Sequence, residues 1–231
     1  MSEASLSVRI AIDPKGDPRG LHLDVAFEVP PGVTVLFGPS GAGKSRTLAC
    51  IAGLVRPDRG RVALGDDVWF DQGRGQERPI HERRTAYVFQ SLALFPHMTA
   101  AENVAYGIPR DVPAEERRRR ALEMLGKMHV PKLADRKPRT FSGGEAQRVA
   151  LARAFAMKPR AVLLDEPFSA LDAGVKRELL REVGEQLAKE RVPAILVTHQ
   201  PEDAEILGER VVFLEKGRVS KTKSMSDAPF R

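Results

Sequence analysis

The fold of this chain is decided by the stretch Gly38-Pro39-Ser40-Gly41-Ala42-Gly43-Lys44-Ser45. The β-branched, apolar run Val33–Phe37 precedes it and is typical of a buried strand. Leu48–Leu54 follows it and can place the apolar face of a helix against a sheet. Strand, glycine loop and helix in this order are the context in which the pattern G-x-x-x-x-G-K-[ST] indicates a phosphate-binding loop.

Phosphate binding follows from the chemistry of such a loop. Its glycines let the backbone approach an anion closely, and its amide N–H groups converge on phosphate oxygens together with the positive end of the next helix. We expect Lys44 to reach the β- and γ-phosphates of a nucleotide and the Ser45 hydroxyl to ligate Mg²⁺. The alternative, an ordinary glycine-rich turn with a surface lysine, does not explain the spacing together with both flanks.

The composition is that of a globular protein with a full core. The 231 residues are 42% hydrophobic and 29% charged, enough for one large domain or two small ones. The net charge of +6 suits nucleic acid, an anionic membrane or anionic nucleotides. Part of that charge is the run Arg117–Arg120, which we interpret as a solvated helix face. The single cysteine, Cys50, allows no disulfide framework and is expected to be buried in the first helix.

Signals for export or membrane insertion are missing from the sequence. Met1–Ser5 lacks the basic and apolar parts of a signal peptide. No apolar run approaches the roughly 20 residues that span a bilayer. We therefore expect any association with a membrane to pass through a partner protein.

The first third of the chain predicts mainly strands. Leu6–Ile12 alternates apolar with small or polar residues, and Leu21–Val29 keeps a strict period of two with one apolar face. After the first helix, short strands are expected at Arg61–Leu64 and Val68–Phe70. The sequence therefore predicts a strand-rich N-terminal part before helices dominate.

A strand at Thr85–Phe89 is predicted to run directly into Gln90. This glutamine is either a polar boundary residue or a side chain that ligates Mg²⁺ and senses the γ-phosphate. Thr99–Thr140 shows no strand alternation and predicts a helical insert, with one helix running from after Pro113 to Leu125.

A second glycine motif, Phe141-Ser142-Gly143-Gly144-Glu145, opens a segment with helical apolar spacing. A hydroxyl and oriented amides at the start of a helix form a second phosphate-binding end. One chain would therefore carry two such ends about a hundred residues apart.

Acids and a histidine follow two further apolar strands. Asp165 and Glu166 come directly after Ala161–Leu164, at the strand end where open α/β sheets bind ligands. Asp165 is expected to organise Mg²⁺ and Glu166 to polarise an attacking water, although acids also simply cap strands. His199 follows Ala194–Thr198; a lone histidine is usually structural, but at this strand end it could meet the γ-phosphate.

The remaining expected elements complete the chain. A turn at Ser169–Asp172 precedes a helix over Val175–Lys189. Val211–Leu214 and Arg218-Val219 are expected to form a short hairpin around Lys216-Gly217.

Over nearly its whole length the chain resembles the ATP-binding subunit of ABC transporters. The matching motifs are Walker A (Gly38–Ser45), the glutamine loop (Gln90), the signature (Phe141–Glu145), Walker B (ending Asp165-Glu166), the D-loop (Ser169–Asp172) and the switch histidine (His199). Within that family, Arg83–Gln90 with Leu94–His97 resembles the importers of molybdate, sulfate and ferric ion. Ser142–Arg148 and Lys176–Leu180 favour the molybdate type.

The resemblance implies an α/β fold with a phosphate-loop NTPase core, a mainly parallel sheet, an N-terminal antiparallel β subdomain and a helical insert. It implies a single ABC ATPase domain over residues 1–231. Residues 1–90 and 159–231 would form the RecA-like core and the β subdomain. Residues from about 91 to 158 would form the helical subdomain with the signature motif.

The resemblance also implies ATP and Mg²⁺ as cofactors and assigns site residues. The catalytic residues would be Glu166, His199 and Gln90. The nucleotide-binding residues would be Gly38, Pro39, Ser40, Gly41, Ala42, Gly43, Lys44, Ser45, Arg46, Ser142, Gly143, Gly144 and Glu145. The metal ligands would be Ser45, Gln90 and Asp165.

The implied partners place the chain on the cytoplasmic face of a membrane. Two copies would sandwich two ATP molecules, each between the phosphate loop of one subunit and the Ser142 loop of the other. The helical insert and the Gln90–Met98 segment would dock onto transmembrane permease subunits, with a substrate-binding protein acting indirectly and no direct contact with nucleic acid. The apolar side chains Leu92, Leu94, Phe95 and Met98 would either make that contact or belong to the core.

Three departures from the family pattern stand out. Arg46 replaces the usual threonine and adds a charge beside the α-phosphate. Phe141 and Glu145 replace leucine and glutamine in the signature. The sequence stops at Arg231, so we expect no C-terminal regulatory β-domain of the kind many relatives carry.

The predicted function is an ATP-hydrolysing subunit that powers an importer for an oxyanion such as molybdate. A non-transport ABC ATPase acting on nucleic acid or ribosomes would show a coiled-coil insertion or tandem cassettes. A small-molecule kinase would leave Ser142 and His199 without a role.

The adenine base lacks an evident aromatic partner. Residues 1–26 contain no Phe, Tyr or Trp, and Phe27 is expected in the core. We expect Ile12 or the stem of Arg19 to cover the base and ATP and GTP to bind with similar affinity.

Overall fold

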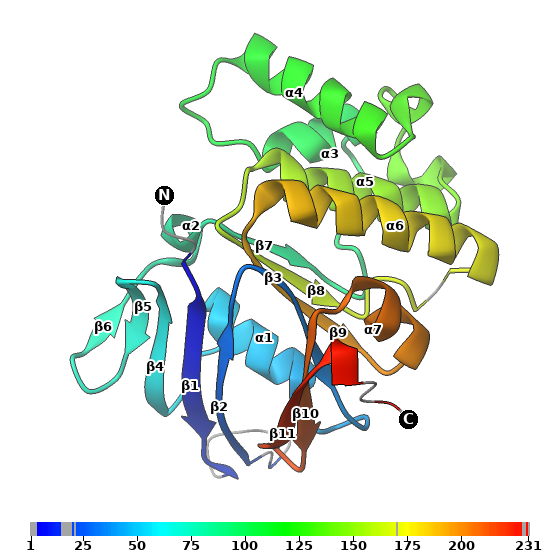
Figure 1. Cartoon of the computed structure of the whole chain (residues 1–231). Coiled ribbons are helices and arrows are strands. Elements are labelled where there is room, and N and C mark those ends of the chain that lie inside the picture. Colours follow the sequence, from blue (N-terminus) through cyan, green and yellow to red (C-terminus); the bar gives the residue numbers. More distant parts are fainter. Residues whose placement is uncertain (1–3, 15–19, 21, 170, 228–229, 231) are drawn as a thin grey trace.

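The computed structural model describes residues 4–14, 20, 22–169, 171–227 and 230 (Figure 1). The strands are β1 (Leu6–Ile12), β2 (Leu23–Val29), β3 (Gly32–Phe37), β4 (Arg59–Leu64), β5 (Asp67–Asp71), β6 (Gln76–Glu77), β7 (Thr85–Val88), β8 (Ala161–Asp165), β9 (Pro193–Thr198), β10 (Arg210–Glu215) and β11 (Arg218–Ser224). The helices are α1 (Lys44–Ala52), α2 (Ile80–Arg83), α3 (Ala100–Tyr106), α4 (Ala114–Lys127), α5 (Gly143–Ala156), α6 (Ala173–Glu190) and α7 (Pro201–Leu207).

Within the described residues the strands form one 11-stranded sheet in the order β6-β5-β4-β1-β2-β11-β10-β3-β9-β8-β7. From β10 to β7 neighbouring strands are parallel, and from β2 to β6 they are antiparallel. The predicted α/β fold with a parallel core and an antiparallel N-terminal part is confirmed. The hairpin of β10 and β11 joins the two parts, because β11 pairs antiparallel with β10 and parallel with β2.

The burial of the strands explains their place in the sheet. Every residue of β8 and β9 is buried, as expected for parallel strands covered on both faces. β2 alternates strictly between buried and exposed residues, so only one of its faces packs on the core. The period-two pattern in the sequence therefore marks the half-covered part of the sheet and the continuous apolar runs mark its centre.

Two hydrophobic clusters lie on opposite faces of the sheet. Leu48 and Ile51 of helix α1 belong to one cluster with inner residues of β1, β2, β8 and β9. Helices α3 to α7 contribute to the other cluster, which includes Phe155 and Leu179. Figure 1 shows α3, α4 and α5 gathered above the sheet next to α6, with α4 outermost. Cys50 is 1% exposed, as expected, and burial raises the pKa of its thiol to about 12.

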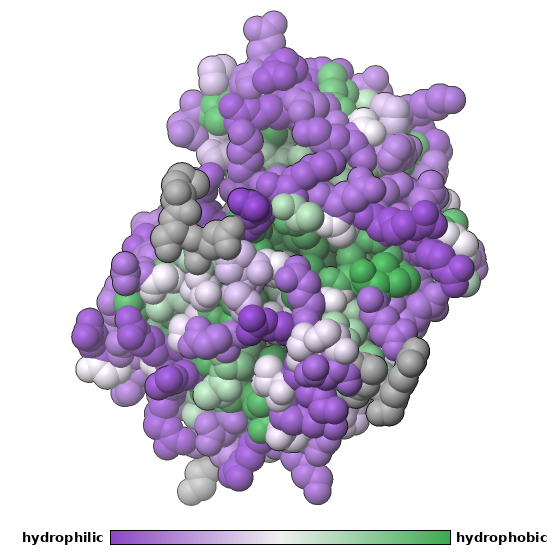
Figure 2. Space-filling model, viewed as in Figure 1, coloured by the Kyte–Doolittle hydropathy of each residue, from purple (hydrophilic) through white to green (hydrophobic). Residues whose placement is uncertain are grey.

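The arginine run on α4 is a solvated helix face, as predicted. Arg119 and Arg120 each donate to the Glu116 carboxylate at 2.7 Å. Figure 2 shows hydrophilic side chains covering this part of the molecule. In the part of the chain that the structure describes, no helix is long and apolar enough to cross a membrane.

Some elements differ from the expectation. Helices α2 and α7 and the short strand β6 were not predicted, because each is too short for a clear periodic pattern. β7 ends at Val88, so Phe89 and Gln90 lie beyond the strand. Leu21, expected in the second strand, lies outside the described residues.

Candidate active site

The parallel strands bring the predicted site residues to one edge of the sheet. Three register pairs align the strand ends: Phe37↔Thr198, Val197↔Asp165 and Leu164↔Val88. Gly38, His199 and Glu166 directly follow these strand ends, and Gln90 follows Val88 after one intervening residue, Phe89. Since β3, β9, β8 and β7 are successive neighbours, side chains more than a hundred residues apart share the carboxyl edge of the sheet.

The phosphate loop connects β3 to α1 and depends on its glycines. A Cβ at Gly38 would lie 2.1 Å from the Leu214 carbonyl oxygen, so only glycine fits there. Gly43 has φ 101° and caps α1 without a side-chain hydrogen bond. The amides at the start of α1 therefore point toward the loop without a capping side chain, which favours an anion at this position.

Lys44 is the first residue of α1 and folds back over the loop. Its Nζ donates to the carbonyl oxygens of Gly38 at 2.7 Å and Pro39 at 2.9 Å, and the residue is 6% exposed. Burial lowers the pKa of Lys44, whereas the carboxylates of Glu166 and Asp165 raise it. A buried cation is thus held at the mouth of the loop, opposite two carboxylates.

Asp165, at the end of β8, receives two hydroxyl donors. Ser45 Oγ donates to Oδ1 at 2.9 Å, and Tyr87 Oη donates to Oδ2 at 3.0 Å. Burial raises the pKa of Asp165, and these two hydrogen bonds oppose that shift. The sequence predicted Ser45 and Asp165 but not Tyr87, whose place in a strand gave no sign of a bond across the sheet.

The oxygens of Ser45 and Asp165 fit a magnesium ion. Mg²⁺ prefers hard oxygen ligands and is usually bound by one or two carboxylates together with phosphate oxygens and water. No described group of three or more His, Cys, Asp or Glu residues could hold a metal ion. At this site Ser45 and Asp165 would supply a hydroxyl and a carboxylate oxygen to such an ion.

Glu166 and His199 form a pair beside this cluster. His199 Nδ1 lies 3.4 Å from Glu166 Oε2. Glu166 adopts φ 46°, a left-handed conformation, and its N–H donates to the Val197 carbonyl oxygen at 3.0 Å. Because non-glycine residues rarely adopt this conformation, the backbone turns the carboxylate away from the strand at an energetic cost. The arrangement places a partly exposed carboxylate next to an imidazole.

Gln90 reaches the same edge without joining the cluster. It is exposed in the turn after β7. Among the described residues, no hydrogen bond links its side chain to Asp165 or Glu166. Its contact with a metal or a phosphate remains a proposal.

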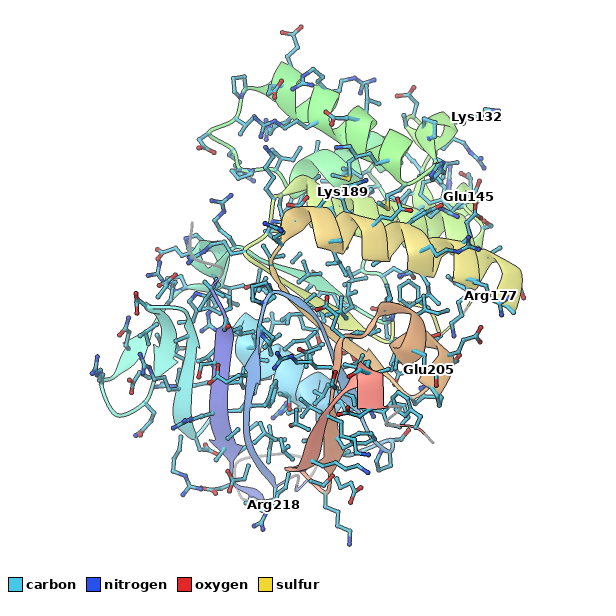
Figure 3. The ribbon with its side chains drawn as sticks, viewed as in Figure 1. Lys132, Glu145, Arg177, Lys189, Glu205 and Arg218 are labelled. Atoms are coloured by element: carbon cyan, nitrogen blue, oxygen red, sulfur yellow. The ribbon has the colours of Figure 1, made fainter. Side chains whose placement is uncertain are left out.

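The second predicted phosphate-binding end, at α5, is closed by its own side chains. Ser142 Oγ accepts from the Glu145 N–H at 3.2 Å, and the Glu145 carboxylate accepts from the Ser142 N–H at 2.7 Å. Gly143 is exposed and Gly144 half-buried. Figure 3 shows Glu145 and Arg177 at one end of the α5 and α6 pair and Lys189 at the other, and Arg148 joins the two helices through Glu178 at 3.2 Å.

A cavity of about 510 Å³ lies beside the phosphate loop. It is lined by Gly20, His22, Ser40, Gly41, Gly43, Lys44, Ser45, Arg46, Glu166 and Lys216. The motif residues Ser142–Glu145 do not line it. One chain therefore brings the phosphate loop and Glu166 together but leaves the α5 end outside this cavity.

His22 and Lys216 are cavity residues that sequence reasoning missed. His22 Nε2 is buried, and no hydrogen-bond partner reaches it from the described residues. The prediction for Ile12 was wrong: it is 3% exposed and packs in the core, because the face that the strand alternation made apolar points inward. Phe27 lies in the core as predicted, and Arg19 lies outside the described residues.

The turn Lys216-Gly217 binds the cavity wall to the phosphate loop. The Gly217 N–H donates to the Ala42 carbonyl oxygen at 3.1 Å, and the Gly217 carbonyl oxygen accepts from the Asp24 N–H at 2.7 Å. A Cβ at Gly217 would lie 1.8 Å from the His22 carbonyl oxygen. The C-terminal hairpin, β2 and the loop therefore meet at one glycine.

Comparison with known proteins gives matches over most of the chain. The sulfate/thiosulfate import ATP-binding protein CysA of Mesorhizobium japonicum is 42% identical and covers 96% of this chain and 64% of that protein. The molybdenum import ATP-binding protein ModC of Rhizobium meliloti is 44% identical over 96% of this chain and 63% of that protein. The Fe(3+) ions import ATP-binding protein FbpC 2 of Rhodococcus jostii is 44% identical over 85% and 56%. The chain thus spans less than two thirds of the length of these relatives.

A solved structure and a family model agree with these matches. The dimeric ATP-binding cassette MJ0796, in a post-hydrolysis state bound to ADP and Pi, has a TM-score of 0.81 and 28% identity, covering 96% of this chain and 98% of that one. The model of the ABC transporter family matches residues 23–169, more than half of the chain. The chain therefore belongs to the ABC transporter family.

Proposed function

We propose that this chain is the ATP-hydrolysing subunit of an ABC importer, with an oxyanion such as molybdate as the cargo. The observation that carries the proposal is the meeting of a buried lysine, a serine–aspartate pair and a glutamate–histidine pair at one sheet edge. Lys44 in the phosphate loop can bind a triphosphate. The nearby carboxylate of Glu166 can accept a proton from an attacking water.

The proposed chemistry is the attack of water on the γ-phosphate of ATP, which forms a bond from the water oxygen to Pγ, breaks the bond from Pγ to the β–γ bridging oxygen and releases ADP and phosphate. Glu166 orients the water and accepts its proton, and His199, 3.4 Å away, holds the γ-phosphate end of the site. Lys44 releases the loop carbonyls and binds the β- and γ-phosphates instead. Arg46 lines the same cavity and adds positive charge near the α-phosphate.

Ser45, Asp165 and Gln90 would hold the magnesium ion. When bound, the ion neutralises negative charge on the phosphate oxygens. The hydrogen bond between Ser45 and Asp165 supports this assignment, because it keeps a hydroxyl and a carboxylate within reach of one ion. Tyr87 contributes by holding the second oxygen of that carboxylate.

Two copies of the chain would close around two ATP molecules. The Ser142–Glu145 end of α5 does not line the cavity of its own chain. A phosphate brought by a second copy would reach this end in competition with its capping box. Each γ-phosphate would then lie between the phosphate loop of one copy and the Ser142 end of the other. The similarity to a dimeric cassette bound to ADP and Pi supports this arrangement.

The helices α3, α4 and α5 with their connections, called here the helical group, would be the docking site for transmembrane subunits. The division we propose assigns residues 1–90 and 159–231 to the core with its β part and about 91–158 to the helical subdomain. A cavity of about 530 Å³ lies between α3 and α4, and its lining includes the apolar residues Met98, Ala101 and Ala105 and the basic residues Arg117 and Arg118. A cytoplasmic helix of a permease fits this groove, so the chain would be peripheral at the cytoplasmic face, and a substrate-binding protein would act through the permease.

The cargo assignment depends on the relatives. Import ATP-binding proteins for molybdenum, for sulfate and thiosulfate and for ferric ions have similar identities of 42 to 44%. The signature phrase Ser142–Arg148 favours molybdate among these.

The function can be tested in two steps. The purified chain should hydrolyse ATP in the presence of Mg²⁺ and lose that activity with EDTA. With its transmembrane subunits in proteoliposomes, turnover should rise when the binding protein is loaded with molybdate and not when it is loaded with ferric ion. If only sulfate stimulated turnover, the chain would still be an importer subunit, but its cargo would be sulfate. A chain without Mg²⁺-dependent ATPase activity would contradict the proposal.

A further inference from the structure

The segment from Gln90 to Thr99 contains no helix or strand, although it carries a predicted site residue. Leu92 and Ala93 adopt φ of 59° and 45°, so two successive non-glycine residues are left-handed. Such a conformation is costly for residues with a Cβ and persists only when the surroundings enforce it. The contacts that enforce it are therefore expected nearby.

Arg153, in the last turn of α5, supplies these contacts. Its Nη1 donates to the Ala93 carbonyl oxygen at 2.7 Å, and its Nη2 donates to the Leu92 carbonyl oxygen at 2.8 Å. One planar guanidinium thus bridges the carbonyls of both left-handed residues. The same group lies 5.5 Å from the centre of the Phe95 ring, close enough for a cation–π contact.

The surroundings of Arg153 are unfavourable for a charged side chain. Its hydrogen-bond partners among the described residues are carbonyl oxygens rather than carboxylates. Burial lowers the pKa of its guanidinium. A half-buried arginine without a carboxylate partner fits a role in holding backbone rather than in balancing charge.

Asn103, on α3, holds the other end of the segment. Its side-chain amide donates to the carbonyl oxygens of Phe95, Met98 and Thr99 at 3.0 to 3.2 Å, and its Oδ1 accepts from the Phe95 N–H at 2.8 Å. Asn103 is completely buried. Residues 92 to 99 are therefore fixed from two helices of the helical group, whereas Gln90 continues from β7 of the sheet.

The two helices that hold the segment also pack on each other. A Cβ at Gly107, which follows α3, would lie 2.8 Å from the Arg153 carbonyl oxygen. Ser142, the N-cap of helix α5, lies about 16 Å from Arg153 along the helix axis. A rigid helix thus has the proposed phosphate-binding end at one terminus and the clamp on the Gln90 segment at the other.

We propose that Arg153 is a positioning residue that couples Gln90 to helix α5. When the Ser142 end of α5 moves toward or away from a nucleotide, the guanidinium carries the Leu92-Ala93 turn with it and sets how far Gln90 reaches into the site. The inference rests on the proposed function for the role of Gln90. The clamp itself rests on the contacts alone.

The clamp can be tested without nucleotide. Hydrogen exchange of residues 91–95 should be measured in the parent chain, in Arg153→Met and in Arg153→Lys. Methionine keeps the apolar stem but donates no hydrogen bond, so exchange of these amides should rise by about tenfold or more while β8 and β9 stay protected. Lysine donates to one carbonyl at a time, so we expect a smaller rise of about threefold.

Arg136→Met is the matched control. Arg136 also bonds a backbone carbonyl of the helical group, that of Thr140 at 2.6 Å, and within the described residues no hydrogen bond joins its side chain to residues 90–99. Its exchange pattern over residues 91–95 should equal that of the parent. Unchanged exchange in Arg153→Met would overturn the clamp, and if that variant did not fold, unchanged exchange in Arg153→Lys would do so.

Kinetics distinguish positioning from a purely structural role. In Arg153→Met, kcat for ATP should fall by about tenfold, because a misplaced Gln90 slows the chemical step. KM should change by less than about threefold, because the phosphate loop is intact. Arg153→Lys should keep part of the parental kcat. A rise in KM together with a loss of folding stability, at unchanged kcat, would contradict a role of Arg153 in positioning Gln90. If the parent chain had no ATPase activity, the proposed function would be contradicted. The hydrogen-exchange experiment would still test the clamp.

Discussion

The starts of α1 and α5 both carry glycines and both were predicted to bind phosphate, yet they are built differently. Helix α1 begins after Gly43 with no side-chain cap and no acidic residue in its first turn. Helix α5 begins after Ser142 with a closed capping box and has Glu145 in its first turn. At α1 a lysine supplies positive charge, and at α5 a carboxylate already occupies part of the positive helix end.

The difference shows that a glycine motif alone does not define an anion site. The amides of α1 lack a capping side chain and can be satisfied by a ligand. At α5, Ser142 and Glu145 satisfy two donors, so a phosphate must compete with a group of the chain itself. We therefore expect α1 to bind nucleotide in a single chain and α5 to contribute only when a second copy delivers the phosphate.

The largest expected effect separates binding from hydrolysis at the α1 site. Glu166→Gln keeps the shape of the side chain but removes the base, so turnover should fall by about 10²- to 10⁴-fold while ATP binding persists. Closed dimers should accumulate, because the α1 end of one copy and the α5 end of the other then remain bound to an unhydrolysed triphosphate. Single-turnover hydrolysis and sedimentation measure the two quantities. Turnover at the parental rate would remove Glu166 from the mechanism.

A mixture of two variants tests whether the α5 end acts on the other chain. Ser142→Arg and Lys44→Ala should each lose ATP-driven pairing alone, because every composite site then has one lesion. In an equal mixture about half of the dimers are mixed and keep one site without either lesion, so pairing should partly return. The Ser142→Arg chain alone should still bind ATP as a monomer. Complete absence of pairing in the mixture would contradict the sandwich.

A smaller effect on ATP-driven pairing is expected when the negative charge of Glu145 is removed from the start of α5. Glu145→Gln can keep the capping box but removes the carboxylate charge, so ATP-driven pairing should strengthen by about two- to fivefold. The measurement is the dimer dissociation constant in the Glu166→Gln background. Helix α3 has the same capping box with Thr99 and Glu102, so Glu102→Gln is the matched control and should leave pairing unchanged. Equal effects of both changes would mean that the charge at α5 does not face the nucleotide.

The smallest expected difference is between ATP and GTP. The contacts of Lys44 and Ser45 with a triphosphate do not depend on the base. His22 lines the cavity and can stack on a base, but stacking is tolerant of sequence because every base has a π-face. Competition titrations should give affinities within about threefold. A preference for ATP of about a hundredfold, or about 2.7 kcal/mol, would show a contact that reads the base.

The sequence predicted those parts of the molecule that follow from local patterns. The phosphate loop, the buried strand before Asp165 and the helix after Pro113 each combine a periodic pattern with a boundary residue. Tyr87, His22 and Arg153 were not predicted, because their roles depend on partners that are distant along the chain. Asn103 likewise looks like any polar helix residue until its four hydrogen bonds with the Phe95–Thr99 backbone are seen.

Ile12 shows a different limit of such reasoning. The alternation around Ile12 correctly predicted a strand, but it could not show what the apolar face of that strand packs against. In the structure β1 lies between β2 and β4, and Ile12 packs in the same hydrophobic cluster as α1. The tertiary packing that buries Ile12 is therefore not contained in the local pattern.

Gly217 has a consequence for how this protein tolerates change over evolutionary time. It belongs to no motif and lies far from the phosphate loop along the chain, but it bonds Ala42 and approaches the His22 carbonyl more closely than any Cβ allows. Its φ of 76° adds a backbone reason for glycine. Among functional homologues this position should drift as little as the loop glycines themselves, and in a saturation library it should be depleted of every other amino acid.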